Sequence, residues 1–380
     1  MISHQEACAL IETGAAGLDD LLVRAGEMRD RGRGRTVTFS AKVFVPLTTL
    51  CRDYCGYCTF RRDPGEPGAH TMEPDEVVAL AQAGDRLGAK EALFSLGDKP
   101  EALFASHREF LRRHGHRTTL SYLRAVCSAV LADSPLLPHA NPGVMGERDL
   151  AALREVNVSM GIMLETVSER LLGRGLAHDR APDKVPARRL RTIALAGKLG
   201  IPFTTGLLIG IGETRRERVD TLVAIRDLHE TLGHIQDVIV QNFRVKPRIP
   251  MREAPEPSLE DLLWTLAVAR LVLGPDVNIQ APPNLSPQVY PRLLAAGLND
   301  WGGISPLTLD HINPEKPWPL IPELRRATES QGFVLRERLA IYPEFATRAE
   351  YLDENLRARV QALVDERGLV KESHERWRRW

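Results

Sequence analysis

Short apolar segments alternate with amphipathic segments along most of this 380-residue chain, and this alternation constrains the fold more than any other feature. The segments expected to form strands are 37–45, 92–96, 136–142, 156–164, 203–211, 237–240, 277–280 and one at Trp301. The segments expected to form helices are 74–87, 101–114, 119–132, 147–155, 186–199, 214–232, 258–273 and 287–296. Strand–helix–strand repetition predicts a parallel sheet with right-handed crossovers. About seven or eight such units predict a closed or nearly closed α/β barrel of the TIM type, with functional residues at the carboxyl ends of its strands.

The expected organisation is a helical lead-in over 1–35, a barrel domain over 36–330 and a charged, helical C-terminal tail over 331–380 that is solvated or loosely docked. The chain carries 50 Lys+Arg and 50 Asp+Glu, so its formal net charge is zero. This balance argues against a nucleic acid or an anionic membrane surface as the main partner. The chain has neither an apolar run of ~18–20 residues nor a signal-peptide pattern, and we expect a cytoplasmic protein.

The five cysteines are unevenly distributed, since Cys8 and Cys127 stand alone while Cys51, Cys55 and Cys58 fall within eight residues. An odd number in a reducing compartment is not a disulfide framework. Thiolates are ligands of iron–sulfur clusters and of zinc, but structural zinc takes four protein ligands. Three thiols predict a cubane cluster with one open iron, able to chelate amino and carboxylate groups. A zinc loop that recruits Cys8, Cys127 or a distant histidine is the alternative.

The segment Leu50–Phe60 resembles the loop of radical S-adenosylmethionine (SAM) enzymes, whose C-x-x-x-C-x-aromatic-C pattern carries a [4Fe–4S] cluster. Segments 94–101, 164–166 and 206–214, together with Arg189, resemble the SAM-binding motifs of that superfamily, although 94–101 has one glycine before its acid instead of the usual pair. The implied cluster ligands are Cys51, Cys55 and Cys58. The implied SAM contacts are Tyr57 and Gly210 for adenine, Gly97 and Asp98 for the amino group, and Glu165 and Arg189 for ribose and carboxylate.

Within the superfamily, the chain is similar to the CofG family, one of two radical SAM components of deazaflavin synthase. The similar segments are 45–60, 94–101, 163–166, 204–210, 300–306 and 310–315. The resemblance spans about residues 36–330 and implies a radical SAM barrel with a six-strand core extended to seven or eight strands.

The CofG resemblance implies a lyase that converts 5-amino-5-(4-hydroxybenzyl)-6-(D-ribitylimino)-5,6-dihydrouracil into 7,8-didemethyl-8-hydroxy-5-deazariboflavin, the precursor of coenzyme F420, with loss of ammonia. A reduced cluster would cleave SAM to methionine and a 5′-deoxyadenosyl radical, which abstracts hydrogen from this small-molecule substrate. The implied partners are a CofH-type companion that makes the substrate and an electron donor such as flavodoxin or ferredoxin.

Polar residues of the later strands and loops are candidates for binding the substrate's polyol and uracil: Gln241, Asn242, Gln280, Asn284 and His311. They are equally compatible with side chains that tie loops together. Trp301-Gly302-Gly303 provides either clearance beside the substrate or a tight turn. Two alternative functions stay open. One is a CofH-like or biotin synthase-like radical SAM enzyme, and the other is a non-catalytic binding protein stabilised by a metal.

Overall fold

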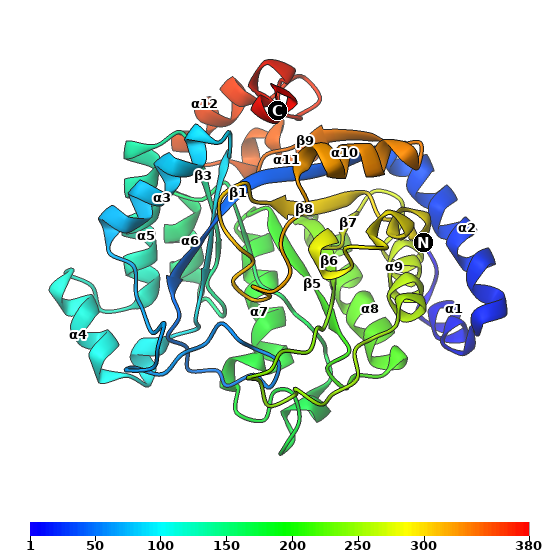
Figure 1. Ribbon diagram of the computed structural model, residues 1–380, viewed down its shortest axis with the longest axis horizontal. Coiled ribbons are helices and arrows are strands. Elements are labelled where there is room, and N and C mark those ends of the chain that lie inside the picture. The colour runs from blue at the N-terminus through cyan, green and yellow to red at the C-terminus, as the bar shows by residue number, and fades with distance from the viewer. Residues whose placement is uncertain (380) are drawn as a thin grey trace.

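The parallel strands β1 to β8 close into a barrel, because β1 pairs with β8 on one side and with β2 on the other. This computed structural model describes residues 1–379 (Figure 1). The barrel strands are β1 (Thr36–Thr48), β2 (Glu91–Leu96), β3 (Leu137–Asn141), β4 (Ser159–Gly161), β5 (Phe203–Ile209), β6 (Ile235–Asn242), β7 (Asn278–Gln280) and β8 (Asp300–Ile304). The TIM-type fold predicted from the alternating pattern is thereby confirmed, with eight barrel strands.

Most residues of the strands are buried because helices cover the outer face of the barrel while side chains fill its interior. All seven residues of β5 are buried. In the register of β1 with β2, Val43, Phe44 and Val45 face Ala92, Leu93 and Phe94, respectively. Since every pair is parallel, all eight carboxyl ends lie at the same rim of the barrel.

Eight helices of the described residues lie between successive strands, as expected from their amphipathic pattern. Their bounds are α3 (Pro74–Arg86), α4 (Ala105–Arg113), α5 (Thr119–Asp133), α6 (Glu147–Arg154), α7 (Pro186–Lys198), α8 (Arg215–Leu232), α9 (Leu259–Leu273) and α10 (Ile321–Ser330). In α8, Thr214 accepts from the Glu217 amide and Gly233 ends the helix at φ +66°. The segment expected to be helical at 287–296 forms a 3₁₀ turn over Tyr290–Ala296, where Pro291 removes a backbone donor.

The two ends of the chain pack against the barrel in different places. At the start, α1 (His4–Ala9) and α2 (Ala15–Arg33) lie outside α8 and α9. After residue 330 the structure differs from the solvated or loosely docked tail expected, because β9 (Val334–Glu337) pairs with β1 as an additional parallel strand. Two short helices, α11 (Pro343–Ala346) and α12 (Glu354–Leu363), follow, and residue 380 lies outside the described part. The division into domains at 35 and 330 stays a prediction.

The segment after β9 closes the amino-terminal end of the barrel. Arg338 forms a bidentate pair with Asp300, at 2.6 and 2.9 Å, and donates to the Tyr342 hydroxyl at 2.7 Å. Nearby, the Tyr342 amide donates to Gln236 Oε1 and the Ser159 hydroxyl to the Ala340 carbonyl, at 3.1 and 2.9 Å. The barrel is therefore plugged at this end by its own chain, which leaves the opposite rim for a ligand.

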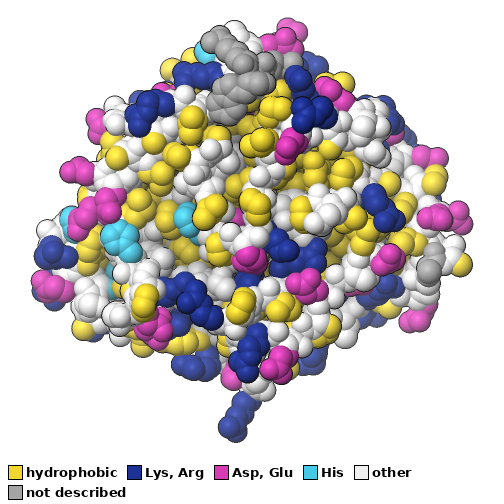
Figure 2. All heavy atoms as spheres, in the orientation of Figure 1, with side chains coloured by type: hydrophobic (Ala, Val, Ile, Leu, Met, Phe, Trp, Pro, Cys, Tyr) yellow, Lys and Arg dark blue, Asp and Glu magenta, His cyan; other side chains and the backbone are white. Residues whose placement is uncertain are grey.

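On the face shown in Figure 2, acidic and basic side chains are interspersed around a more apolar centre. This mixed distribution is consistent with the equal numbers of acidic and basic residues in the sequence. Within residues 1–379, none of the helices combines the length and the apolar character that crossing a bilayer requires.

The buried pair at the plug gives a prediction for stability. Replacing Arg338 by Met leaves the buried Asp300 carboxylate without its partner, so we expect the free energy of unfolding to fall by about 3–5 kcal/mol. The matched control is Arg348→Met, which removes an exposed pair with Glu350 and costs at most about 1 kcal/mol. Urea unfolding measures both values, and equal losses would show that the plug does not stabilise the barrel.

Candidate active site

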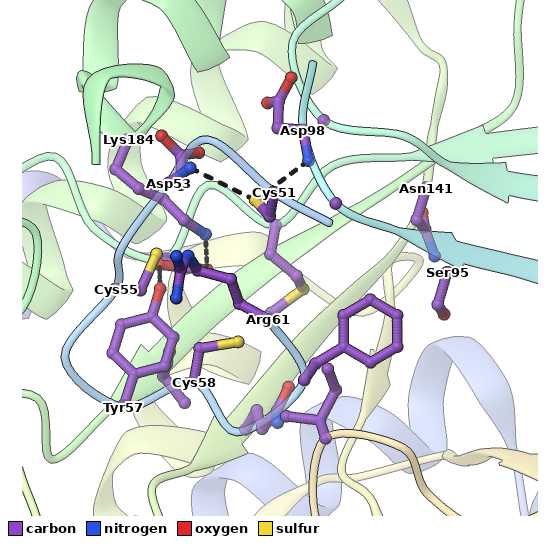
Figure 3. Close-up of a pocket in the computed structure, with 18 of the residues that line it drawn as sticks. Cys51, Asp53, Cys55, Tyr57, Cys58, Arg61, Ser95, Asp98, Asn141 and Lys184 are labelled. Atoms are coloured by element: carbon purple, nitrogen blue, oxygen red, sulfur yellow. Dashed lines mark hydrogen bonds and ion pairs between the residues drawn. The ribbon is translucent and has the colours of Figure 1, made fainter. Parts of the chain in front are cut away.

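A cavity of about 270 Å³ opens at the carboxyl-end rim of the barrel (Figure 3). Its lining comes from the loops that follow several strands, including those after β1, β2, β3, β4 and β6. In a barrel of this type the loops at this rim carry the functional groups. The lining residues that the sequence had singled out are Cys51, Cys55, Tyr57, Cys58, Gly97, Asp98, Glu165, Arg189, Gln241 and Asn242.

The loop after β1 brings its three cysteines to this cavity. Backbone hydrogen bonds fix the loop to the segment after β4, from the Tyr54 amide to the Arg180 carbonyl at 2.9 Å and from Gly56 to Ala177 at 2.8 Å. The loop is thus held at two points by a segment more than a hundred residues away in sequence. Cys51, Cys55 and Cys58 all belong to the lining, as the close-up in Figure 3 shows.

The chemistry of the thiols fits a metal centre. The backbone amides of Asp53 and Asp98 donate to Cys51 Sγ at 3.4 and 3.2 Å, drawn as dashed lines in Figure 3. Such N–H···S bonds favour the thiolate and tune iron–sulfur centres. Without a metal, burial and the neighbouring Asp53 carboxylate raise the pKa of Cys51 to about 12, and burial also raises the pKa of Cys55. A bound metal supplies the positive charge that reverses this preference and holds both sulfurs as thiolates.

The spacing of the donors favours a cluster over a single zinc ion. Zinc binds sulfur at about 2.3 Å, so the sulfurs around one tetrahedral ion lie about 3.8 Å apart. Among the described residues, the only trio of potential ligand atoms within 4.8 Å of one another is Asp53, Asp98 and Asp183. The three thiols are therefore spread more widely than the ligands of one zinc.

The other two cysteines do not complete a set of four thiols. Neither Cys8 nor Cys127 lines the cavity, and Cys127 Sγ instead lies 3.8 Å from Asn157 Oδ1 in the core. Three thiols at the rim, spread around a cavity, fit the donor set of a [4Fe–4S] cluster with one iron left without a cysteine.

Gly97 has a packing role that the sequence did not show. A Cβ at this position would lie 1.9 Å from the Leu50 carbonyl oxygen and 2.6 Å from Cys51 Cβ. The Gly97 amide also donates to the Thr48 carbonyl at 3.0 Å. The end of β2 thus lies directly against the start of the cysteine loop, and only glycine fits there.

An acidic and basic network occupies the side of the cavity next to Cys51. Asp98 Oδ2 accepts from the Val144 amide at 3.0 Å, while Lys99 Nζ lies 3.4 Å from Oδ1. Burial, together with the neighbouring Asp183 and Asp53 carboxylates, raises the pKa of Asp98 to about 6 despite the Lys99 ammonium. A ligand cation beside Asp98 would favour its ionised form. The negative charge of the aspartate trio is partly balanced by Arg52, whose Nη2 donates to Asp183 at 2.6 Å.

Glu165 is the centre of a second network. Its carboxylate accepts hydrogen bonds from Lys184 and from the Tyr57 hydroxyl, and His178 Nε2 lies 3.0 Å away. Although burial disfavours the charged form, the Lys184 ammonium and the His178 hydrogen bond hold the pKa of Glu165 well below its usual range. Glu165 also has φ +66°, a conformation that non-glycine residues rarely adopt and that is concentrated at functional sites.

Arg189 reaches the cavity from the first turns of α7. Its Nη1 donates to the Met163 carbonyl at 2.8 Å, while its buried Nε has no hydrogen-bond partner within the described part of the chain. A buried guanidinium with an unused donor is suited to a ligand carboxylate.

Four of the candidate residues lie elsewhere. Gln280 lines a second, deeper chamber, and the other three line neither cavity. The Gly210 amide donates to the Glu213 carboxylate at 2.9 Å, and Asn284 donates to Asp310 and to the Lys316 carbonyl, which ties two loops together. His311 packs edge-on against Phe60. The roles predicted for these residues in SAM or substrate binding are not tested by their placement.

Several groups at the site were not singled out by the sequence, notably Asp53, His178, Asp183, Lys184 and Lys246. Three of these lie on the long loop between β4 and α7. A long, charged loop after a barrel strand indicates by itself that the loop contributes to the functional rim. The spacing of residues within the loop does not indicate that Lys184 is the one that reaches the site.

Comparisons with known proteins agree with this geometry. The radical SAM superfamily profile matches residues 45–225. A 7,8-didemethyl-8-hydroxy-5-deazariboflavin synthase from Methanopyrus kandleri is 50% identical over 335 residues, which cover 88% of this chain and 100% of that protein. The chain belongs to this family of radical SAM proteins. The resemblance to the radical SAM superfamily and to its CofG members is thereby confirmed.

The chain is also similar to longer relatives, and it shares its fold with solved structures. FO synthases from Streptomyces coelicolor and Mycobacterium tuberculosis are each 49% identical and cover 98% and 96% of this chain. The chain spans only 44% of the length of either FO synthase. The fold is shared by the FeFe-hydrogenase maturase HydG from Carboxydothermus hydrogenoformans. The two structures have a TM-score of 0.71 and 19% sequence identity, and the match covers 92% of this chain and 78% of that chain. Methylornithine synthase (PylB) also shares the fold (TM-score 0.67, 18% identity, 88% of this chain and 94% of that chain).

The contact at Gly97 gives a second prediction. In Gly97→Ala the added methyl group displaces the cysteine loop, so we expect iron incorporation on anaerobic reconstitution to fall at least about fivefold while the barrel stays folded. Iron per chain and far-UV circular dichroism measure the two properties. Gly14→Ala is the control, because a Cβ at Gly14 meets nothing within 4 Å. Normal iron content in Gly97→Ala would contradict the assigned packing role.

Proposed function

We propose that this chain catalyses the ring-closing step of deazaflavin formation, as the lyase described by its CofG resemblance. The reaction converts 5-amino-5-(4-hydroxybenzyl)-6-(D-ribitylimino)-5,6-dihydrouracil into 7,8-didemethyl-8-hydroxy-5-deazariboflavin, with cleavage of SAM and loss of ammonia. The observation that carries the proposal is the 50% identity with the Methanopyrus synthase over that protein's entire length. The three thiols around one cavity support it from the structure.

Cys51, Cys55 and Cys58 are the proposed ligands of a [4Fe–4S] cluster. When bound, the reduced cluster and SAM supply a 5′-deoxyadenosyl radical that removes hydrogen from the substrate. Asp98 would accept from the SAM ammonium, and the unused Nε of Arg189 would donate to its carboxylate. Charge-assisted contacts of this kind orient SAM at the cluster.

Glu165 is proposed to bind the ribose hydroxyls of SAM. Because the carboxylate stays ionised, it only accepts hydrogen bonds and therefore suits hydroxyl donors. Tyr57 and Lys184 fix its orientation by donating to it. Gly97 is proposed to contact the amino group of SAM, as the resemblance implies. Tyr57 and Gly210 are proposed to contact its adenine.

The remaining walls of the cavity would protect a reactive intermediate. Apolar side chains line it between the polar networks, among them Phe60, Ile162, Leu208 and Phe243. Such side chains exclude water, which limits side reactions. Gln241 and Asn242 lie at the same wall and are proposed substrate contacts.

Two partners follow from this function. A CofH-type companion would supply the hydroxybenzyl adduct, and a flavodoxin- or ferredoxin-type protein would deliver one electron to the cluster. The FO synthases extend well beyond the region matched by this chain, which leaves room in those proteins for a second activity. Such a donor would approach the proposed cluster from the rim, where Cys51 and Cys58 are residues of intermediate exposure.

The direct test is product analysis with the synthetic adduct. Anaerobically reconstituted protein with SAM and dithionite should form the fluorescent deazaflavin, methionine, 5′-deoxyadenosine and ammonia. Coupling of tyrosine to the ribitylaminouracil without ring closure would instead assign a CofH-type activity. One bound zinc and no cleavage of SAM would identify a non-catalytic, metal-stabilised protein.

The thiol assignment predicts the behaviour of Cys55→Ala. This variant should lose the cluster absorbance near 400 nm and at least about 99% of deazaflavin formation, because a cubane held by two cysteines is not retained. Its circular dichroism should remain that of the wild type, since the barrel has its own core. Cys8→Ala is the matched control and should keep both properties. A globally unfolded Cys55→Ala would indicate a structural metal instead.

The Glu165 network predicts that a change at Glu165 alters the affinity for SAM but not the iron content. Glu165→Gln replaces an ionised acceptor by a neutral amide, and we expect the Kd of SAM to rise about 10–100-fold. Equilibrium dialysis with reconstituted protein measures this value, while iron content should stay constant. Glu155→Gln, on an exposed pair with Arg124, should leave the affinity unchanged. An unaltered Kd in Glu165→Gln would remove this residue from the SAM site.

A further inference from the structure

A second chamber of about 180 Å³ lies inside the barrel, deeper than the rim cavity. Asn141, Met163, Gln241 and Ile312 line both spaces, so the two adjoin. The deep end is bounded by Gln236 and Asp237 at the start of β6 and by Arg338 and Tyr342 of the C-terminal plug. A molecule that enters at the rim can therefore extend into the barrel interior.

The two cations that line the chamber, Lys42 and Arg338, are already paired. Lys42 Nζ donates to Glu91 Oε1 at 2.8 Å, and Arg338 is held by Asp300. The Lys42 ammonium holds the pKa of Glu91 below its usual range although the carboxylate is buried. His139 lies 2.6 Å from the Ser159 hydroxyl, and burial lowers its pKa to about 4, so this ring is neutral at physiological pH. Asp237 accepts from the Thr204 hydroxyl and Asp310 from the Asn284 and Asn313 amides, so these further carboxylates bring no cation with them. The lining therefore offers no free cation to an anionic ligand.

Two amides, by contrast, face the chamber with unused hydrogen-bonding capacity. The side chains of Gln241 and Gln280 line it and form no hydrogen bond with the described residues 1–379. Each amide offers two donors and one acceptor oxygen. Groups of this kind match hydroxyl and amide functions on an uncharged ligand.

The glycines of β8 make room for the side chains that define the chamber. A Cβ on Gly302 would lie 2.2 Å from Gln280 Nε2, and a Cβ on Gly303 would lie 2.0 Å from Lys42 Cε. Gly302 also has φ +73°. The Trp301-Gly302-Gly303 segment thus gives clearance to Lys42 and Gln280, which in turn line the chamber.

An aromatic pair completes the wall. Phe44 and Trp318 stack with ring centroids 5.0 Å apart and planes 6° from parallel, and both line the chamber. Flat apolar surfaces of this kind pack well against a planar heterocycle. The chamber therefore combines a planar apolar face with two neutral amides.

We propose that the deep chamber binds the polyol-bearing heterocyclic half of the substrate through Gln241 and Gln280, and that it selects the uncharged polyol against its phosphate ester. This inference rests on the proposed function. The hydroxybenzyl half then lies in the rim cavity, next to Phe60, Leu208 and the cysteine loop. A terminal phosphate would approach the Glu91 carboxylate without meeting a free cation, which costs binding energy.

The test measures binding, separately from turnover. The probe is 5-amino-6-ribitylaminouracil, and its Kd is determined by equilibrium dialysis against anaerobically reconstituted protein. We expect the Kd to rise at least about tenfold in Gln280→Leu and in Gly303→Ala, while the Kd of SAM stays unchanged. Gln361→Leu and Gly14→Ala are the matched controls, because Gln361 is exposed and a Cβ at Gly14 meets no neighbour.

The 5′-phosphate ester of the same compound tests the charge selectivity. It should bind at least about tenfold more weakly than the free polyol in the wild type. The proposal would be overturned if Gln280→Leu and Gly303→Ala both bound the polyol as tightly as the wild type does. It would also be overturned if the wild type bound the ester and the free polyol with equal affinity. Deazaflavin formation by the wild-type protein is scored independently. Its absence would refute the proposed function, whereas normal formation with unaffected variants would refute only the deep chamber.

Discussion

The closure of eight parallel strands into a barrel is the constraint on which the site depends. Parallel hydrogen bonding places every carboxyl end at one rim, so loops distant in sequence meet around one cavity. The plug formed by Arg338 and Tyr342 closes the other end. The interior is thus approached from the carboxyl-end rim, where apolar side chains between the polar networks exclude water.

Within that frame, the cysteine loop depends on contacts made by other strands. Its thiols lie at the cavity because Gly97 of the β2 end allows close approach and because the loop after β4 binds its backbone. The same β4 loop contributes Lys184 and His178 to the Glu165 network. Proposed cluster ligands and proposed SAM ligands are thus fixed by shared segments of the chain.

Much of the fold and part of the site could be predicted from local patterns. The alternation of apolar strands and amphipathic helices gave the barrel, since periodicity reports which face is buried. The spacing of Cys51, Cys55 and Cys58 gave a three-thiol loop, and all three line the cavity. The packing of β9 and of the segment after it could not be predicted in this way. The charged residues of this segment form buried pairs with residues far away in the sequence, and local sequence patterns do not distinguish such residues from charged residues exposed to solvent.

The sequence by itself determined the parallel barrel class, the thiol loop and the relationship to the radical SAM family, because these reside in short-range spacing and residue identity. Only the tertiary structure decided which side chains share a cavity. It brought Lys184 to Glu165, separated Asn284 and His311 from the cavities, and assigned Gly302 and Gly303 to the clearance of Gln280 and Lys42. Such contacts join residues far apart along the chain, and close packing fixes them only once the barrel has closed.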